Sequence, residues 1–221
     1  MRRHALSTRL WHWVNFACVA VLLMSGLNIS NAHPWLYWGD QGFLASDAWL
    51  FLPRFPGWAT IPSHYSLAEA RSWHLLVAWP FALGLLAMWI AMLANRHFAR
   101  DLVTRRDEWR WRAVRDDIAK HLRLEFSHEG KFNFLQKLSY GLVLGVLLPG
   151  AIVTGMALAP GLDPLMAPLS DLVGGRQSMR SLHFLFAAAL LGFTLLHVAL
   201  VLVSGPARQM RDMITGGPRE A

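Results

Sequence analysis

Cysteine and charge are both scarce in this chain. Its 221 residues include a single cysteine, Cys18, and only 16% of them are Asp, Glu, Lys or Arg. One cysteine excludes an internal disulfide and a thiolate metal cluster, and because no C-x-x-C-H occurs, covalent attachment of c-type haem is excluded as well. So little charge, with 54% hydrophobic residues and eleven tryptophans, is typical of a polytopic membrane protein and not of a soluble domain.

Four apolar runs are long enough to cross the hydrocarbon core as helices, which takes about 20 residues each. We expect these spans at residues 10–29, 73–94, 132–159 and 182–204. The predicted fold class is therefore an all-α integral membrane protein, a single domain over residues 1–221 in which four helices form a bundle. The basic start of the first run is similar to a signal peptide, but no A-x-A site closes that run, so we interpret it as a retained span.

The positive charge is distributed unevenly among the connections. Lys and Arg number three in residues 1–9, ten in 95–131 and three in 205–221, but only two each in 30–72 and 160–181. This asymmetry predicts that both termini and the 95–131 loop are cytoplasmic, and that connections 30–72 and 160–181 are periplasmic. We interpret the net charge of +7 as a topology signal with anionic lipid as its partner, and we expect no nucleic-acid binding.

Several local patterns predict how the spans begin, bend and pack. Ser66–Glu69 reads S-L-A-E, a capping box that starts the second helix, and Pro149 is expected to interrupt the third. Gly141 and Gly145 form a small-xxx-small pattern that permits close helix packing. The aromatic-rich connection 30–72 is compatible with an interfacial aromatic belt and equally with a docking surface.

Four histidines lie in the predicted spans, where polar side chains are costly and are read as functional by default. His183 and His197 are fourteen residues apart, which on a helix is about 21 Å along nearly one face. His12 lies near the cytoplasmic end of the first span and His74 near the external end of the second. The topology therefore predicts two pairs at two levels, His12 with His197 and His74 with His183.

Two facing imidazoles are an axial ligand pair for haem iron. A zinc or copper site would need a third or fourth ligand, and the sequence offers none at either level. Gly26, fourteen residues after His12, leaves room for a porphyrin at the external level. Three arginines, each three residues before one of these histidines, are candidates for contacts to haem propionates or are interfacial anchors: Arg9, Arg71 and Arg180.

Motifs in all four spans resemble one family. "HALSTRLWHW", "RSWHLLVAW", "FNFLQKLSYG" and "RSLHFLFAAALLGFTLLHVAL" are similar to the bacterial cytochrome b561 family, which includes the membrane cytochrome b subunits of formate dehydrogenase, nickel–iron hydrogenase and thiosulfate reductase. The resemblance implies a four-helix bundle holding two non-covalent b haems. His12 and His197 would ligate the cytoplasmic-side haem, and His74 and His183 the external one.

The resemblance also implies a quinone site beside the cytoplasmic-side haem. The formate dehydrogenase relatives carry an N-x-G-Q-K pattern at the start of span three, and this chain reads N-F-L-Q-K. Asn133, Gln136 and Lys137 match the pattern, whereas Leu135 replaces its glycine. The quinone would be ubiquinone or menaquinone.

The function implied is electron transfer across the bacterial inner membrane, between a periplasmic redox partner and the quinone pool. The partner would be a molybdenum or nickel–iron oxidoreductase subunit or a cytochrome c, and whether the chain itself reduces quinone or oxidises quinol is left open. The alternative is a stand-alone superoxide:quinone oxidoreductase of the same fold, with Arg71, Arg176 and Arg180 as a basic external patch. A bundle without redox activity, structural or transporting, is a third reading.

Overall fold

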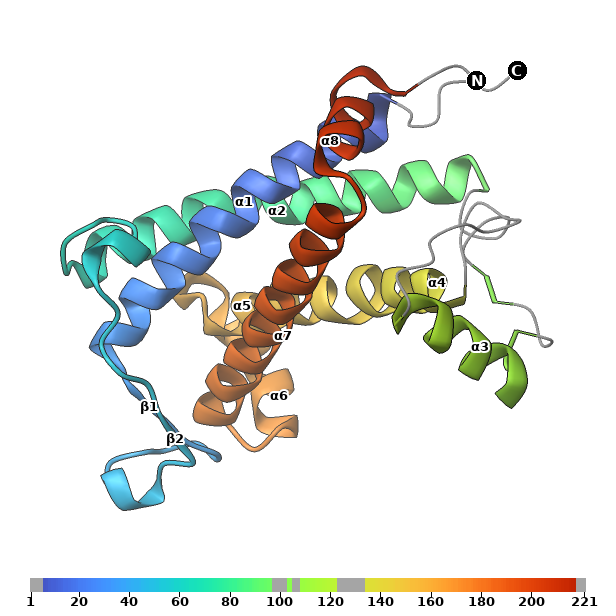
Figure 1. Cartoon of the computed structure of the whole chain (residues 1–221). Helices are drawn as coiled ribbons and strands as arrows, with labels where there is room; N and C mark the ends of the chain where they lie inside the picture. Colours follow the sequence, from blue (N-terminus) through green and yellow to red (C-terminus); the bar gives the residue numbers. More distant parts are fainter. Residues whose placement is uncertain (1–5, 97–102, 105–107, 123–133, 218–221) are drawn as a thin grey trace. The chain divides into compact units, whose positions relative to one another are not determined.

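The computed structural model describes residues 6–96, 103–104, 108–122 and 134–217 (Figure 1). Four helical segments in these ranges are long and apolar enough to cross a membrane: α1 (Leu6–Ala32), α2 (Leu67–Ala94), Phe134–Leu158 and α7 (Arg176–Val203). Each coincides with a predicted span, so the all-α class with four spans is confirmed. Three of the predicted runs begin several residues too late, because hydropathy marks the apolar part of a helix and not its polar first turns.

The spanning helices keep many large apolar side chains exposed. Examples are Leu76, Leu83 and Leu93 of α2 and Leu195 and Leu202 of α7, each between 58% and 69% exposed. In water this much apolar surface would be costly, whereas in hydrocarbon the same side chains are solvated and the helical backbone satisfies its own hydrogen bonds. The exposed surface therefore suits helices surrounded by lipid.

The third span is interrupted as Pro149 predicts. α4 (Phe134–Leu142) passes into a π-helical turn, Val143–Leu147, before α5 (Leu148–Leu158). Pro149 has no N–H, and its ring crowds the carbonyl of Gly145, so the regular α-helical bonding pattern cannot continue through this turn. The pattern of Gly141 and Gly145 permits close helix packing, but among the described residues no heavy atom lies within 4 Å of a Cβ added at either.

The first turn of α2 forms as the capping box predicts. The Glu69 N–H donates to Ser66 Oγ at 3.4 Å, and the helix begins at the next residue, Leu67. The Glu69 carboxylate lies 3.2 Å from Nε2 of His64. A hydroxyl at this position satisfies one of the backbone donors that a helix start leaves unpaired, so the sequence signal had a direct structural cause.

The chain forms two compact units. The first comprises residues 1–12, 85–147 and 192–221, with α3 (Trp111–Leu122), α4 and α8 (Pro206–Thr215). The second comprises residues 13–84 and 148–191, with α5, α6 (Asp163–Leu172) and a two-stranded hairpin. Both termini and the 95–131 connection thus belong to one unit, and the other two connections to the other. This grouping is what the charge-based topology requires; the side each faces stays a prediction.

Within the second unit, the connection after α1 caps the start of α7. β1 (Trp35–Leu36) pairs antiparallel with β2 (Leu50–Phe51), and beyond β1 the carbonyl of Gly39 accepts the N–H groups of Gln177 and Ser178, each at 3.0 Å. These are donors that the first turn of a helix cannot satisfy internally. Gly175, at φ +113°, allows these two segments to approach this closely. A Cβ at this position would lie 2.5 Å from Cα of Asp40.

A second set of bonds joins the same hairpin to α7. The buried Ser181 hydroxyl donates to the Tyr37 carbonyl at 2.6 Å and accepts the indole N–H of Trp49 at 2.9 Å. Arg180 donates to the Trp35 carbonyl. The stacked Trp38 and Trp49 rings, with centroids 5.6 Å apart, remain partly exposed. The aromatic connection is therefore a folded element fixed to the helix that carries His183, a description compatible with both an interfacial belt and a docking surface.

Candidate functional site

The structure brings the four predicted histidines together in the two predicted pairs. In the second unit, His74 of α2 faces His183 of α7, with ring centroids 6.1 Å apart and planes at 73°. In the first unit, His12 of α1 faces His197 of α7, with centroids 6.3 Å apart and planes at 60°. Three helices thus supply four imidazoles, two to each unit.

These separations fit a metal ion between the rings. A metal–imidazole bond of about 2.0 Å on each side, added to about 1.2 Å from each nitrogen to its ring centre, separates two facing ring centres by about 6.4 Å. Aromatic rings in direct contact also have centroids about 4.5–7 Å apart, so the separation allows a shared metal ion without by itself requiring one. The observed 6.1 and 6.3 Å leave room for bis-histidine coordination at both pairs.

The donor set also fits haem and not a bare metal ion. No group of three or more His, Cys, Asp or Glu side chains able to hold a metal ion occurs among the described residues. Structural and catalytic zinc sites use at least three protein ligands, whereas a haem iron already has four porphyrin nitrogens and takes two axial ligands. Two imidazoles at each level are complete for haem and insufficient for zinc.

Hydroxyl groups from neighbouring helices contact the rings of the His74–His183 pair. Ser25 Oγ lies 3.0 Å from Nδ1 of His74, and Thr154 Oγ1 lies 3.0 Å from Nδ1 of His183. Ser25 is fully buried, and Thr154 is 5% exposed. With Nδ1 occupied in this way, Nε2 is the nitrogen of each ring that remains for a metal.

Each hydroxyl is followed in sequence by a glycine that faces the same ring. A Cβ on Gly26 would lie 3.7 Å from Cε1 of His74, an ordinary contact, and one on Gly155 would lie 3.2 Å from Cε1 of His183, a tight one. Contacts within the protein therefore do not require glycine at residue 26, since an alanine side chain would fit there. The missing methyl group there is consistent with the expected room for a porphyrin, a role that stays a prediction.

The His12–His197 pair has different neighbours. The Phe193 ring stacks on His197, with centroids 6.0 Å apart and planes at 13°. Arg9, one turn before His12 on α1, is 8% exposed and donates to the carbonyl of Ile214 in α8. The C-terminal helix, which the sequence analysis did not anticipate, thus binds the buried arginine next to this pair.

Two of the three arginines predicted to contact propionates have an Nε–H donor with no acceptor among the described residues. The Nε atoms of Arg9 and Arg180 are buried and have no hydrogen-bond partner among the residues that the structure describes. A buried guanidinium N–H without an acceptor is costly, and a haem propionate is the kind of carboxylate that would satisfy it. Arg71, by contrast, is exposed, as an interfacial anchor would be.

His33 joins the external arginines, which the sequence reasoning did not foresee. Partial burial and then the positive charges of Arg180 and Arg71 lower the pKa of His33 below its usual 6.5. Three basic side chains therefore lie near one another, close to the end of α1 and the starts of α2 and α7. Arg176, the remaining member of the suggested superoxide patch, bonds to Asp163 at 2.5 Å and to the Leu158 carbonyl at 3.1 Å. Its charge is thereby neutralised, which weakens that alternative.

The residues of the expected quinone site lie partly outside the described residues. Asn133 is outside them, and Gln136 lies within α4. Lys137 forms a 2.6 Å ion pair with Glu108 in which both side chains are mostly buried, at 11% and 18% exposure. A carboxylate of Asp117, on α3, accepts the N–H of Leu135 at 3.0 Å. Residues 108–122 of this connection therefore pack on the start of α4, where the described part of the quinone pattern lies.

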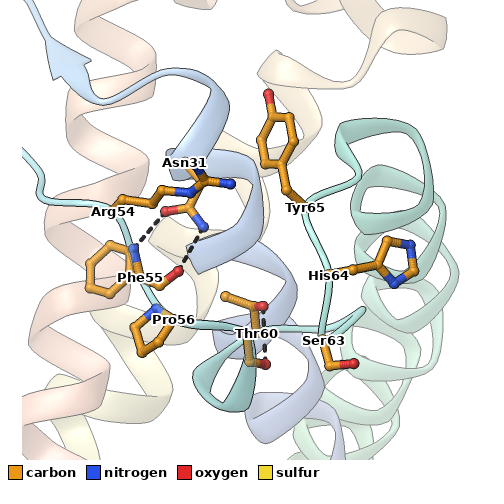
Figure 2. A pocket seen from close by; sticks show the side chains of 9 residues that line it. Asn31, Arg54, Phe55, Pro56, Thr60, Ser63, His64 and Tyr65 are labelled. Atoms are coloured by element: carbon orange, nitrogen blue, oxygen red, sulfur yellow. Dashed lines mark hydrogen bonds between the residues drawn. The ribbon is translucent and has the colours of Figure 1, made fainter.

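A separate cavity of about 310 Å³ lies in the connection between α1 and α2 (Figure 2). The Asn31 amide closes one side by bonding both the N–H and the carbonyl of Phe55, at 2.7 and 3.1 Å. Arg54 lies over the Tyr65 ring, 5.4 Å from its centroid. None of the four paired histidines lines this cavity, so it is distinct from both imidazole pairs.

Sequence reasoning missed Ser25, Thr154 and Gly155. The available signal was a hydroxyl residue followed by glycine inside an apolar run, S-G at residues 25–26 and T-G at 154–155. Such dipeptides are common in membrane helices, since small residues line helix contacts. Only the position of a histidine on another helix distinguishes these two, and that position is tertiary information.

One family of known proteins matches nearly the whole chain. The family model described as prokaryotic cytochrome b561 matches residues 3–216, and the chain therefore belongs to the prokaryotic cytochrome b561 family, whose members are membrane cytochromes b. It is a multi-pass protein of the bacterial inner membrane. A relative from Azospira oryzae, named "Putative protein-methionine-sulfoxide reductase subunit YedZ1", is 26% identical over 200 residues, covering 87% of this chain and 86% of the relative. No solved structure matches the chain.

Proposed function

We propose that this chain is one membrane domain, residues 1–221, that binds two b haems and transfers electrons between the periplasmic face and the quinone pool. The observation that carries the proposal is the pair of imidazole separations, 6.1 Å for His74 and His183 and 6.3 Å for His12 and His197. When bound, haem supplies one-electron oxidation and reduction. Two axial imidazoles leave the iron no free position, which favours electron transfer over oxygen chemistry.

The proposed roles of the basic residues follow from their burial. Arg9 and Arg180, each with a buried Nε and no partner for it among the described residues, would donate to propionates of the cytoplasmic-side and external haem. Arg71 would contribute positive charge at the external surface. Ten basic residues in the 95–131 connection would face anionic headgroups on the cytoplasmic side.

We place the quinone, ubiquinone or menaquinone, at the start of α4. Asn133 is the proposed donor to a quinone carbonyl, with Gln136 and Lys137 beside it. Lys137 and Glu108 form an ion pair there and are both mostly buried. Because each charge is paired with the other, this part of the protein holds charged groups away from bulk water, which supports placing a polar quinone site beside them. A quinone whose reduction takes up protons requires such polar groups at the membrane edge.

The electron partner is proposed to be a periplasmic oxidoreductase. The name of the Azospira relative makes that protein a subunit of a reductase, which supports a partner of this class over a free cytochrome c. The hairpin that caps α7 offers the partner a folded surface of exposed aromatic side chains, among them Trp38 and Phe43 at 50% and 83% exposure. This surface lies on the element bonded to Ser181, two residues before His183.

The test is charge movement across reconstituted vesicles. Electrons that enter at the external face and reduce quinone at the cytoplasmic face cross the membrane dielectric, which is worth about 2.3 kcal/mol per charge per 100 mV. With dithionite outside as the reductant and a quinone analogue in the bilayer, a potential-sensitive dye should show the interior turning negative. Asn133→Leu should abolish the signal while leaving dithionite reduction of the haems intact. A full rate of quinone reduction without any potential would place donor and quinone on one face and contradict the proposal.

A further inference from the structure

The hydroxyl groups of Ser25 and Thr154 each contact two carbonyls of their own helix and one imidazole of another helix. Ser25 Oγ bonds the Val21 carbonyl at 2.7 Å and Nδ1 of His74 at 3.0 Å. Thr154 Oγ1 bonds the Gly150 carbonyl at 2.6 Å and Nδ1 of His183 at 3.0 Å. A carbonyl oxygen only accepts, so the single hydroxyl proton is directed to the carbonyl. With its proton on a carbonyl, the oxygen accepts from the ring, and in this arrangement each Nδ1 carries the hydrogen.

The arrangement differs from ordinary hydroxyl bonding within membrane helices. Serine and threonine commonly bond the carbonyl four residues earlier, as Ser30 does with Gly26 at 2.8 Å. Ser25 and Thr154 add a second bond to an imidazole of another helix, and both are almost fully buried. The same pattern occurs once on α1 and once on α5, each time followed by a glycine that faces Cε1 of the same ring.

We propose that Ser25 and Thr154 are positioning residues that hold His74 and His183 in the Nδ1–H tautomer, direct both Nε2 atoms at the haem iron and lower the potential of that haem. The inference rests on the proposed function, because it assumes that these two histidines are the axial ligands. An acceptor on the Nδ1–H makes the imidazole a more basic ligand. A more basic ligand stabilises ferric iron more than ferrous iron, and the midpoint potential falls.

The experiment is a spectroscopic redox titration of the purified full-length protein with its haem. Thr154→Val removes the hydroxyl at nearly constant shape, and Ser25→Ala does the same on α1. Two variants serve as matched controls: Thr154→Ser keeps the acceptor, and Ser30→Ala removes a hydroxyl of α1 bonded to its own helix. The two haem components are followed separately, and the low-spin ferric electron paramagnetic resonance signal is recorded for each protein.

Thr154→Val and Ser25→Ala should each raise the potential of one and the same haem. At the wild-type midpoint, the ratio of reduced to oxidised haem should increase by about three- to tenfold, as expected when one hydrogen bond that favours the oxidised state is lost. A tenfold change is about 59 mV for a one-electron couple. The ferric resonance of this haem should shift as well, whereas Thr154→Ser, Ser30→Ala and the second haem should stay within twofold of wild type.

The outcomes separate this inference from the proposed function. If wild type carries two haems and both hydroxyl deletions leave every midpoint unchanged, the positioning role is overturned and the haem assignment stands. If His74→Ala and His183→Ala retain both haems, the assignment itself fails. If Thr154→Val loses a haem that Thr154→Ser keeps, the hydroxyl is required and the inference is supported. If Thr154→Val and Thr154→Ser both lose the haem, the shape of the side chain at residue 154 is the cause. In that case an unchanged midpoint potential in Ser25→Ala refutes the inference.

Discussion

Ser181→Ala should release the hairpin from the start of α7. The hydroxyl is fully buried and makes two bonds, to the Tyr37 carbonyl at 2.6 Å and from the Trp49 indole at 2.9 Å. Each bond is worth about 0.5–1.5 kcal/mol net, and a buried partner left unsatisfied costs about 1–3 kcal/mol. Since water can reach part of the loosened hairpin, we expect a total loss of about 2–4 kcal/mol in the free energy of unfolding.

The assay is reversible unfolding in mixed detergent, followed by helical circular dichroism. Trp49→Phe keeps the ring but removes the N–H, and should cost about 0.5–1.5 kcal/mol. In a protein that already carries Ser181→Ala, the additional cost of Trp49→Phe should be close to zero. The coupling energy between the two side chains should therefore be about 0.5–1.5 kcal/mol. Ser204→Ala, which removes a hydroxyl bonded to its own helix at 3.4 Å, is the control and should stay within about 0.5 kcal/mol of wild type.

Hydrogen exchange locates the effect. In Ser181→Ala, the amides of residues 35–51 should exchange faster, whereas those of α4 should be unchanged, because local opening involves only the segment that lost its contacts. Costs of Ser181→Ala and Trp49→Phe that simply add would mean that the two side chains do not interact. In that case the account of the hairpin as a cap bonded to α7 would be refuted.

Three further predictions concern charged side chains. Arg180→Gln should lower the potential of one haem and Arg180→Lys should restore part of it, because a nearby positive charge favours the reduced state; redox titration checks this. The lowered pKa of His33, caused by partial burial and then by Arg180 and Arg71, means that the unfolded chain binds more protons, so stability should fall as the pH is lowered through 6.5 toward the folded pKa. Thermal melts of wild type and His33→Gln compared at pH 7 and 5 should show a slightly smaller loss in the variant. Lys137→Met should cost about 1–3 kcal/mol by removing the cation that compensates the mostly buried Glu108 carboxylate, and adding Glu108→Gln should recover part of that loss in detergent unfolding.

The pairing of the four histidines was predictable from the sequence because it depends on two simple lengths. Helical rise and bilayer thickness fix the depth of a residue in a span, so His12 and His197 could be matched, and likewise His74 and His183. The break before Pro149 and the start of α2 after Ser66 were predictable for a similar reason. In each case a local backbone rule decides the outcome.

The remaining features depend on which helix lies beside which. Ser25 and Thr154 resemble any hydroxyl in an apolar helix until a histidine from another helix is placed against them. The cap that Gly39 supplies to α7 joins residues more than a hundred positions apart, and no periodicity encodes such a contact. The small-xxx-small pattern at Gly141 and Gly145 illustrates the converse, since a pattern that permits close helix approach does not by itself bring a partner.

The central claim is that two haems are held by two specific histidine pairs. The most direct measurement is the haem content of the four single variants, His12→Ala, His74→Ala, His183→Ala and His197→Ala, by pyridine haemochrome assay combined with redox titration. Wild type should carry close to two haems per chain. His74→Ala and His183→Ala should lose one and the same redox component, and His12→Ala and His197→Ala the other. One haem per chain in wild type, or loss of the same component from His12→Ala and His74→Ala, would contradict the account.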